Sequence, residues 1–253
     1  MRTEQQLVSP TPFIIYCCHM SMEPRLDIVG AALADPSRIR ILCELMDGRS
    51  HTGKELASVA GVAANTASGH LGKLIEAGIV AAEKSGRCIY YRVASAEIAE
   101  VLEQMSALSP TDHLYRAHGT SIAPELIART CYNHIAGRLG VLLAREMTSQ
   151  GLVSVEGTSA RVTEAGAQTF AEIGIWSNGT PLPDVKCCLD WSERRQHFSG
   201  QLGTALLSHA LSQNWVTRPR NGRALAIEPT GYDTFERYFG VKRADLSGQA
   251  DPQ

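Results

Sequence analysis

The sequence lacks any run of about twenty apolar residues, the length that an α-helix needs to cross a bilayer. The apolar stretch Phe13-Ile-Ile-Tyr-Cys-Cys18 is short and has neither the basic flank nor the small-residue cleavage pattern of a signal peptide. We therefore expect no membrane span and no membrane partner.

Signatures of several large enzyme classes are also missing. The sequence contains no G-x-S-x-G elbow, no P-loop, no H-E-x-x-H motif and no glycine-rich dinucleotide fingerprint. We therefore expect a protein that is not an enzyme and has no organic cofactor. The alternative is a thiol enzyme in which Cys131 or Cys188 acts as the nucleophile and His134 or His197 activates it.

Neither a disulfide framework nor a strong positive charge is present. The chain has seven cysteines, an odd number, and they are scattered along the sequence. This pattern is typical of a protein of the reducing cytoplasm and predicts no structural disulfide. The formal net charge is −2, but residues 49–92 hold six Lys or Arg against three Asp or Glu, a local balance of +3. A modest positive surface of this kind on a dimer can bind DNA, with an affinity that falls as salt rises.

Residues 62–80 have the pattern of a DNA-recognition helix. One face is apolar at helical spacing and is expected to pack on the rest of a domain. It consists of Ala64, Ala67, Leu71, Leu74 and Ile75. The opposite face carries short polar side chains and a cation, which are suited to base edges and phosphates in a major groove. The predicted DNA contacts on this face are Asn65, Thr66, Ser68, His70 and Lys73.

A β-wing is expected directly after this helix. Residues 79–82 and 89–93 have strand character, and the glycine-containing turn between them carries two cations, Lys84 and Arg87. A cationic hairpin tip suits a phosphate or the minor groove, so both residues join the predicted DNA contacts.

The preceding residues predict two short helices that complete a helix-turn-helix. Pro36 can occupy a first helical position, and the following apolar residues recur at helical spacing until Gly48. These residues, expected in the core, are Ile39, Leu42, Cys43 and Met46. Thr52 and Glu55 have capping-box spacing and open a second helix that ends at Gly61.

A longer helix after the wing is expected to form a dimer interface. Ser95 can cap it, and its apolar stripe is longer than one contact within a small domain requires. The stripe comprises Ile98, Val101, Leu102, Met105 and Leu108.

Three segments of this region resemble the ArsR-type bacterial repressors: Ala34-Asp-Pro-Ser-Arg-Ile-Arg-Ile-Leu42, Ser68-Gly-His-Leu71 and Gly86-Arg-Cys-Ile-Tyr-Tyr-Arg92. The resemblance covers roughly residues 23–109. It implies a homodimer that represses transcription at a palindromic double-stranded operator and is released by an inducer, often a metal or metalloid and in some members a thiol oxidant.

The inducer sites that the resemblance implies are missing here. The arsenite-type site needs a Cys-Val-Cys motif, and the corresponding Lys54-Glu-Leu-Ala-Ser-Val59 has no cysteine. The zinc-type site needs Asp and His pairs on the dimer helix, and residues 95–108 contain no His. Any inducer must therefore bind elsewhere in the chain. The recognition helix also departs from the family pattern at Ala63 and Ala64.

The chain is long enough for a second domain, and its C-terminal half contains an internal repeat at an offset of 63 residues. His134-Ile-Ala-Gly-Arg-Leu-Gly140 matches His197-Phe-Ser-Gly-Gln-Leu-Gly203, and Gly151 aligns with Asn214. Residues 162–170 resemble residues 227–235 after a two-residue insertion. Each copy predicts a helix, two short strands and a closing helix.

The expected fold is therefore mainly α with small β-wings. A winged helix-turn-helix domain for DNA binding and dimerisation is followed by a duplicated, winged-helix-like α+β domain. The predicted boundaries are a flexible tail over 1–22, the winged domain over 23–109, the duplicated domain over 119–243 with copies at about 124–175 and 187–240, and a flexible tail over 244–253.

Two cysteine and histidine pairs in the repeat are candidates for sensing. Cys131 and His134 are expected on one face of a helix, and the repeat makes His197 the counterpart of His134 and Arg194 the counterpart of Cys131. If a pseudo-twofold axis brings the copies together, Cys131, His134, Cys188 and His197 meet as a Cys2His2 set for a soft metal or metalloid ion, or as a redox pair.

Three alternatives remain for the C-terminal domain. Aromatic residues, namely Trp191, Trp215, Tyr132 and Phe198, can line a pocket for an organic inducer. A cluster of Arg218, Arg220 and Arg223 can touch DNA phosphates. The domain can also be a rigid extension of the dimer with no inducer.

Overall fold

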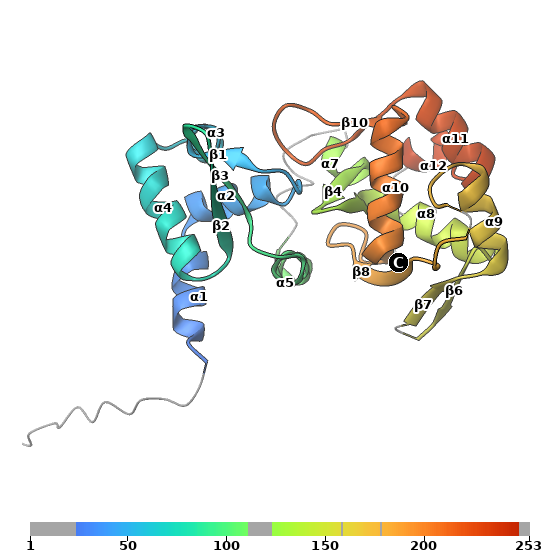
Figure 1. Cartoon of the computed structure of the whole chain (residues 1–253), viewed down its shortest axis with the longest axis horizontal. Coiled ribbons are helices and arrows are strands. Elements are labelled where there is room, and N and C mark those ends of the chain that lie inside the picture. Colours follow the sequence, from blue (N-terminus) through green and yellow to red (C-terminus); the bar gives the residue numbers. More distant parts are fainter. Residues whose placement is uncertain (1–23, 111–122, 158, 178, 248–253) are drawn as a thin grey trace, which may run out of the picture.

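The structure is a computed structural model that describes residues 24–110, 123–157, 159–177 and 179–247 in two lobes (Figure 1). No helix in these ranges is both long and apolar enough to cross a membrane. The N-terminal lobe consists of α1 (Leu26–Leu33), α2 (Pro36–Leu45), β1 (His51–Thr52), α3 (Gly53–Ala60), α4 (Ala64–Glu76), β2 (Val80–Ser85), β3 (Cys88–Val93) and α5 (Ala96–Leu108).

The helix boundaries in this lobe follow from local capping. Pro36 is the first residue of α2, and the Asp35 carboxylate accepts hydrogen bonds from the backbone N–H groups of Ser37 and Arg38. Thr52 and Glu55 form a reciprocal capping box at α3, and Gly61 ends that helix with a φ of 68°. The predicted starts of both helices and the end of α3 at Gly61 are confirmed, whereas α2 ends at Leu45, before the predicted stop at Gly48.

The buried faces of α2 and α4 differ in part from the prediction. On α2 the core side chains are Ile41, Leu42, Leu45 and Met46. Cys43 is exposed, as is Ile39, so their assignment to the core was wrong. The packed face of α4 consists of Ala67, Leu71 and Leu74, whereas Ala64 and Ile75 are exposed. The buried side of α2 is therefore rotated toward Ile41 and Leu45, and α4 buries a narrower stripe than predicted.

The wing is a three-stranded antiparallel sheet in the order β1-β3-β2. Ser85 pairs with Cys88, which leaves a two-residue turn in which Gly86 has a φ of 60°. The predicted β-wing is confirmed, with its turn far from the core.

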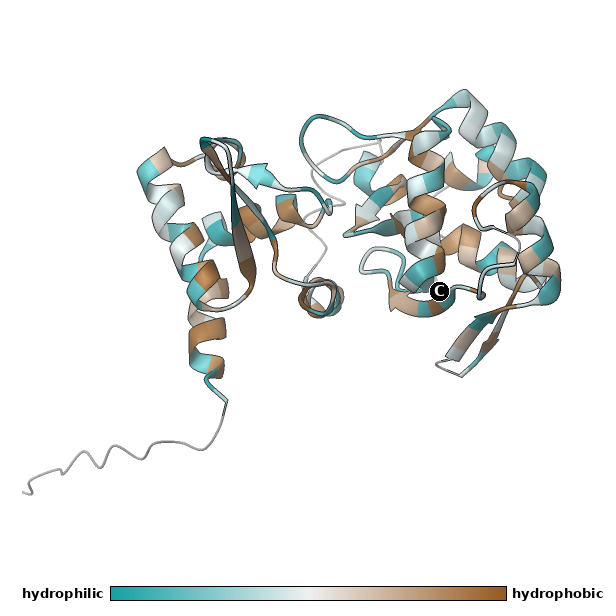
Figure 2. Cartoon of the chain, in the orientation of Figure 1, coloured by the Kyte–Doolittle hydropathy of each residue, from teal (hydrophilic) through white to brown (hydrophobic). Residues whose placement is uncertain are grey.

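The long helix α5 is capped by the Ser95 hydroxyl, and only some of its apolar side chains pack against the core of its own lobe. Ile98 and Leu102 are half-buried against the core of the N-terminal lobe. Three further side chains remain exposed, namely Val101, Met105 and Leu108. Figure 2 shows this helix as an apolar element at the edge of the lobe.

The C-terminal lobe contains two sets of elements in the same order. The first set is β4 (Arg129–Cys131), β5 (His134–Ala136), α8 (Gly137–Ser149), β6 (Val153–Glu156), β7 (Ser159–Val162) and α9 (Glu164–Glu172). The second set is β8 (Asp184–Leu189), β9 (Gln196–Ser199), α10 (Gly200–Ser212), β10 (Val216–Thr217), β11 (Ala226–Ile227) and α11 (Pro229–Phe239). The short helices α7 (Pro124–Ile127) and α12 (Arg243–Ser247) flank them.

Each set begins with a strand pair and not with a helix, which corrects the predicted order. Gly137 and Gly200 occupy the same place at the strand-to-helix junction, with φ of 77° and 73°. Gly151 and Asn214 also share a left-handed conformation, with φ of 70° and 55°. The helices α8 and α10 pack against the strands of the opposite set, β9 and β5, and one hydrophobic core joins the two sets.

The predicted C-terminal tail starts too early. Residues 244–247 belong to α12, where Leu246 is 2% exposed and its carbonyl accepts a hydrogen bond from Arg138. The expected tail over 1–22 lies outside the described residues, as do residues 248–253.

The two lobes contact each other through α2, α5 and the loop before β11. Gly222 donates its N–H to both carboxylate oxygens of Glu44, and Arg218 donates to the Asp47 carbonyl. The Arg223 guanidinium forms an ion pair with Glu103 of α5, whose side chain is 3% exposed. Arg194 donates to the Ala107 carbonyl at the end of α5. The helix predicted to form the dimer interface is therefore attached to the C-terminal lobe.

Candidate functional site

The predicted DNA-binding residues lie on one exposed side of the winged lobe. Asn65, Thr66 and Ser68 are exposed in the first two turns of α4, and Lys73 is exposed nearer its end. The wing adds two exposed cations, Lys84 and Arg87. In Figure 1 this helix lies on the side of the winged lobe away from the C-terminal lobe.

His70 differs from the other predicted contacts, because its ring is half-buried and faces the start of α2. Its Nδ1 lies 3.3 Å from Arg38 Nη1 and 3.9 Å from Asp35 Oδ1. Arg38 in turn donates to the carbonyls of Ala31 and Ala32. These contacts support a positioning role for His70 between α4 and α2 more than a direct base contact.

The four predicted sensing residues come together in the C-terminal lobe. The ligand atoms of Cys131, His134, Cys188 and His197 all lie within 4.8 Å of one another, and all four residues are buried. The two sulfur atoms are 3.9 Å apart and the two Nε2 atoms are 3.0 Å apart. The imidazole rings stack with centroids 4.9 Å apart.

The local structure of this cluster differs from the predicted helix. Cys131 ends β4 and His134 begins β5, and the two residues face each other as an antiparallel pair. The Tyr132-Asn133 turn joins them, with Tyr132 at a φ of 58°. A non-glycine residue in the left-handed region is a turn feature that helical spacing does not reveal.

The second hairpin reproduces this pair in a different register from the sequence repeat. Cys188 faces His197 across β8 and β9 as Cys131 faces His134. Cys188 is therefore the structural counterpart of Cys131, and the assignment of Arg194 to that role was wrong. The offset of 63 fails here because eight residues separate Cys188 from His197 and only two separate Cys131 from His134.

Burial and hydrogen bonding give the two thiols opposite protonation preferences. Burial raises the pKa of the Cys131 thiol well above its usual value. The hydrogen bond from Cys131 lowers the pKa of Cys188 below its usual range, and both histidines act in the same direction. Burial also lowers the pKa of His134, which keeps this imidazole neutral. The cluster thus combines a thiolate, a thiol and a neutral imidazole, which are soft electron-pair donors.

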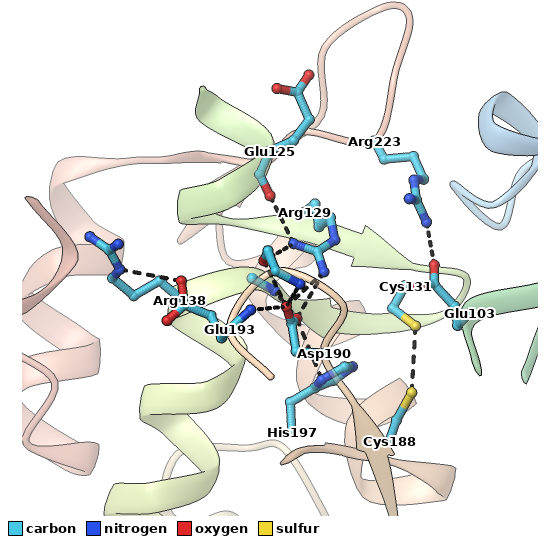
Figure 3. A network of polar contacts seen from close by, with 12 residues as sticks. Glu103, Glu125, Arg129, Cys131, Arg138, Cys188, Asp190, Glu193, His197 and Arg223 are labelled. Carbon is cyan, nitrogen blue, oxygen red and sulfur yellow. Dashed lines mark hydrogen bonds and ion pairs between the residues drawn. The ribbon is translucent and has the colours of Figure 1, made fainter. Parts of the chain in front are cut away.

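A buried ion pair supports the cluster from one side (Figure 3). Arg129 donates to both carboxylate oxygens of Asp190 at 2.9 Å, and both side chains are 0% exposed. Asp190 Oδ2 also lies 3.6 Å from His197 Nδ1. Burial alone would raise the pKa of Asp190, but the Arg129 charge, His197 and hydrogen bonds from Ser192 and Glu193 together outweigh it and hold the pKa well below the usual range.

The supporting residues were not predicted from the sequence. On the other histidine, Asn133 Oδ1 lies 3.3 Å from His134 Nδ1. His134 Nδ1 therefore has a hydrogen-bond partner, whereas His197 Nδ1 is buried without one, and both Nε2 atoms face the cluster. The only sequence signal was the position of Asp190 two residues after Cys188 in the strand-ending Cys-Cys-Leu-Asp segment.

A cleft of about 580 Å³ gives access to the cluster between the two lobes. Cys131, His134 and Cys188 contribute to one wall, and Ala96, Ala99 and Glu100 of α5 contribute to another. A ligand that binds at the cluster therefore lies next to α5, the helix that is predicted to form the dimer interface.

The predicted aromatic pocket does not form as a unit. Trp215 and Phe198 belong to the hydrophobic core, and Trp191 packs under the Arg129 guanidinium at 4.0 Å. Tyr132 alone of the four lines the cleft. Of the three predicted phosphate-binding arginines, Arg218 and Arg223 are used in contacts between the lobes, and Arg220 is exposed. The vicinal Cys187 is half-buried and lies outside the four-residue group, as expected for alternate strand positions.

Gly203 allows the close approach of the two sets of elements. A Cβ atom there would lie 2.9 Å from His134 Cβ and 2.6 Å from the Phe198 carbonyl. We expect Gly203→Ala to lower the free energy of unfolding by about 1 to 3 kcal/mol through overpacking, as measured by urea denaturation. Gly72→Ala, where a Cβ meets nothing within 4 Å, should be neutral or stabilising. Equal losses for both variants would contradict this packing argument.

Comparisons with known proteins agree with the geometry of the winged lobe. Residues 33–82 match a family model described as a helix-turn-helix domain. The chain is 39% identical over 225 residues to the uncharacterized HTH-type transcriptional regulator YdfF of Bacillus subtilis (strain 168), a match that covers 87% of this chain and 100% of YdfF. It is 39% identical over 88 residues to the HTH-type transcriptional regulator CmtR of Mycobacterium tuberculosis (strain ATCC 25618 / H37Rv), covering 35% of this chain and 73% of CmtR.

Among solved structures, the chain is similar to the homodimeric winged helix-turn-helix DNA-binding domain Mb0332 from Mycobacterium bovis, a possible ArsR-family transcriptional regulator. The sequences are 32% identical, the match covers 35% of this chain and 82% of the other, and the TM-score is 0.31. These proteins are named as regulators of transcription, and the match to YdfF extends through the C-terminal lobe.

Proposed function

Because the chain belongs to the helix-turn-helix transcriptional regulators and its winged lobe resembles the ArsR type, we propose that this DNA-binding regulator acts as a homodimer whose operator affinity changes when an effector reaches its C-terminal lobe. We propose repression as its action, released by the effector, and no catalytic step. The two copies of the C-terminal repeat are proposed to form one sensing domain.

The observation that carries this proposal is the position of the hairpin turn between Cys131 and His134. Tyr132 donates its N–H to the Met46 carbonyl at 2.8 Å, directly after α2, and its side chain packs against the core of the winged lobe. Gly48 lies so close to this turn that a Cβ there would be 2.3 Å from the Tyr132 carbonyl. A displacement of Cys131 or His134 is therefore passed directly to the helix-turn-helix.

A dimer interface on α5 is supported by its exposed apolar side chains. Val101, Met105 and Leu108 are 53%, 44% and 86% exposed and lie on one side of the helix. Burial of such side chains against a second copy is favourable by about 25 cal/mol per Å² of apolar surface. The Glu103–Arg223 ion pair fixes the same helix to the C-terminal lobe, so the effector site and the spacing of the two recognition helices are linked.

The proposal that α4 docks in the major groove can be tested directly by replacing Lys73. We expect Lys73→Ala to weaken binding to the operator and to lower the slope of log affinity against log salt by about two, because each protomer of the dimer loses one phosphate contact. The measurement is fluorescence anisotropy of the full chain with DNA from upstream of its own gene, at several salt concentrations.

The matched control removes the same charge from the other lobe. Lys242 is exposed on the C-terminal lobe, so Lys242→Ala should leave both the affinity and the salt slope unchanged. An unchanged slope in Lys73→Ala, or an equal change in Lys242→Ala, would show that α4 does not dock as proposed. Sedimentation of the same sample checks the dimer.

A further inference from the structure

We propose that Cys131, His134, Cys188 and His197 bind one soft divalent metal ion, of the zinc and cadmium class, in a tetrahedral site. The site itself rests on the geometry of the C-terminal lobe. Its role as the effector site rests in addition on the proposed function.

The spacing of the four ligand atoms fits a tetrahedron. Zinc binds sulfur at about 2.3 Å and imidazole nitrogen at about 2.0 to 2.1 Å, so tetrahedral edges are about 3.8 Å between sulfurs and about 3.3 Å between nitrogens. The structure has 3.9 Å between the two sulfurs and 3.0 Å between the two Nε2 atoms. The remaining distances are at most 4.8 Å, so small side-chain rotations complete the site.

The supporting contacts also favour a metal. A histidine that binds a metal through Nε2 usually directs its Nδ1 at a carboxylate or another oxygen, which fixes the ring orientation and the tautomer. Asn133 Oδ1 occupies this place beside His134, and the Asp190 carboxylate lies 3.6 Å from His197 Nδ1, just beyond hydrogen-bond distance. Two Nε2 atoms that face each other at 3.0 Å can form only one hydrogen bond, in which one nitrogen donates and the other accepts. A metal ion bound to both nitrogens uses the lone pair of each.

The donor set selects the class of ion. Two sulfur and two imidazole ligands in a tetrahedral arrangement suit zinc or cadmium, and they disfavour magnesium and calcium, which prefer oxygen. Four protein ligands close a tetrahedral site, which suits stable binding and not metal-based catalysis. The cleft beside Cys131, His134 and Cys188 provides the path by which the ion enters.

The site also has a physical connection to the winged lobe. Cys131 and His134 flank the Tyr132 turn that contacts Met46. Next to Cys131, Thr130 donates its N–H to the Arg223 carbonyl, and Arg223 pairs with Glu103 on α5. An ion that draws the two hairpins together therefore acts on α2 and on α5 at once.

Titration of the full chain with Co²⁺, as a spectroscopic probe for zinc, tests the site. We expect one ion per chain, a thiolate charge-transfer band and the visible bands of tetrahedral cobalt, all removed by added Zn²⁺. Cys188→Ser should lose the charge-transfer intensity in part and bind at least tenfold more weakly, while Cys187→Ser should bind as the wild type does. An octahedral spectrum, or equal binding by both variants, would overturn the proposal.

A measurement on the wild type covers the case in which Cys188→Ser does not fold. Alkylation followed by mass spectrometry should show that Zn²⁺ protects Cys188, which lines the cleft, whereas the exposed Cys88 is modified at the same rate with and without the ion. Absence of protection would overturn the site. Operator binding is measured separately: protection without any change in operator affinity supports the site and overturns its role as the effector.

Discussion

Replacement of Asp190 with asparagine is expected to lower the free energy of unfolding by about 3 to 5 kcal/mol, because it leaves the Arg129 charge buried without a counterion. Arg129 and Asp190 are both 0% exposed, so water cannot replace the lost carboxylate. Asp190 also accepts hydrogen bonds from the backbone N–H groups of Gly137, Ser192 and Glu193, which tie both halves of the lobe to one side chain. Urea denaturation of the full chain measures the loss.

An exposed ion pair provides the control for this measurement. Arg161 and Glu156 are 71% and 68% exposed, so Glu156→Gln should cost less than about 1 kcal/mol. Similar losses for the two variants would mean that Arg129 finds other partners. If Asp190→Asn remains folded, its cobalt affinity should fall by about 10- to 100-fold, since the negative charge 3.6 Å from His197 Nδ1 is lost.

The N-terminal lobe could be predicted from the sequence because its signals are local. The Thr52 and Glu55 capping box, Pro36 at a helix start and the wing turn at Gly86 each depend on residues within a few positions. The face of a helix that is buried depends instead on what packs against it. Cys43 therefore fits a helical apolar pattern and is still exposed.

The C-terminal cluster could be predicted only in part. The repeat places His134 and His197 at equivalent positions, and a pseudo-symmetric arrangement then brings Cys131 and Cys188 to the same place. The local geometry was wrong because a tight hairpin and one helical turn both bring residues i and i+3 together. The contact between Arg129 and Asp190, 61 positions apart, has no periodic signal, and neither does the contact between Tyr132 and Met46.

The same geometry predicts that the metal-free protein forms a Cys131–Cys188 disulfide on exposure to hydrogen peroxide. The two sulfur atoms are 3.9 Å apart, and side-chain rotation can bring them to the disulfide bond length of about 2 Å. The hydrogen bond from Cys131 lowers the pKa of Cys188, so Cys188 is the thiolate that attacks. A new S–O bond forms as the O–O bond breaks, and the departing hydroxide takes up a proton.

Cys131 completes the reaction by attack on the sulfenic acid of Cys188, with loss of its own proton and release of hydroxide, so that two thiols and one peroxide give one disulfide and two waters. Peptide mapping of the non-reduced protein should identify this disulfide. Cys187→Ser should form it unchanged, and bound Zn²⁺ should slow it strongly, because a coordinated thiolate has its electron pair engaged by the metal. A disulfide between Cys187 and Cys188, or oxidation that Zn²⁺ does not slow, would contradict a shared site, since metal binding and oxidation then use different sulfur atoms.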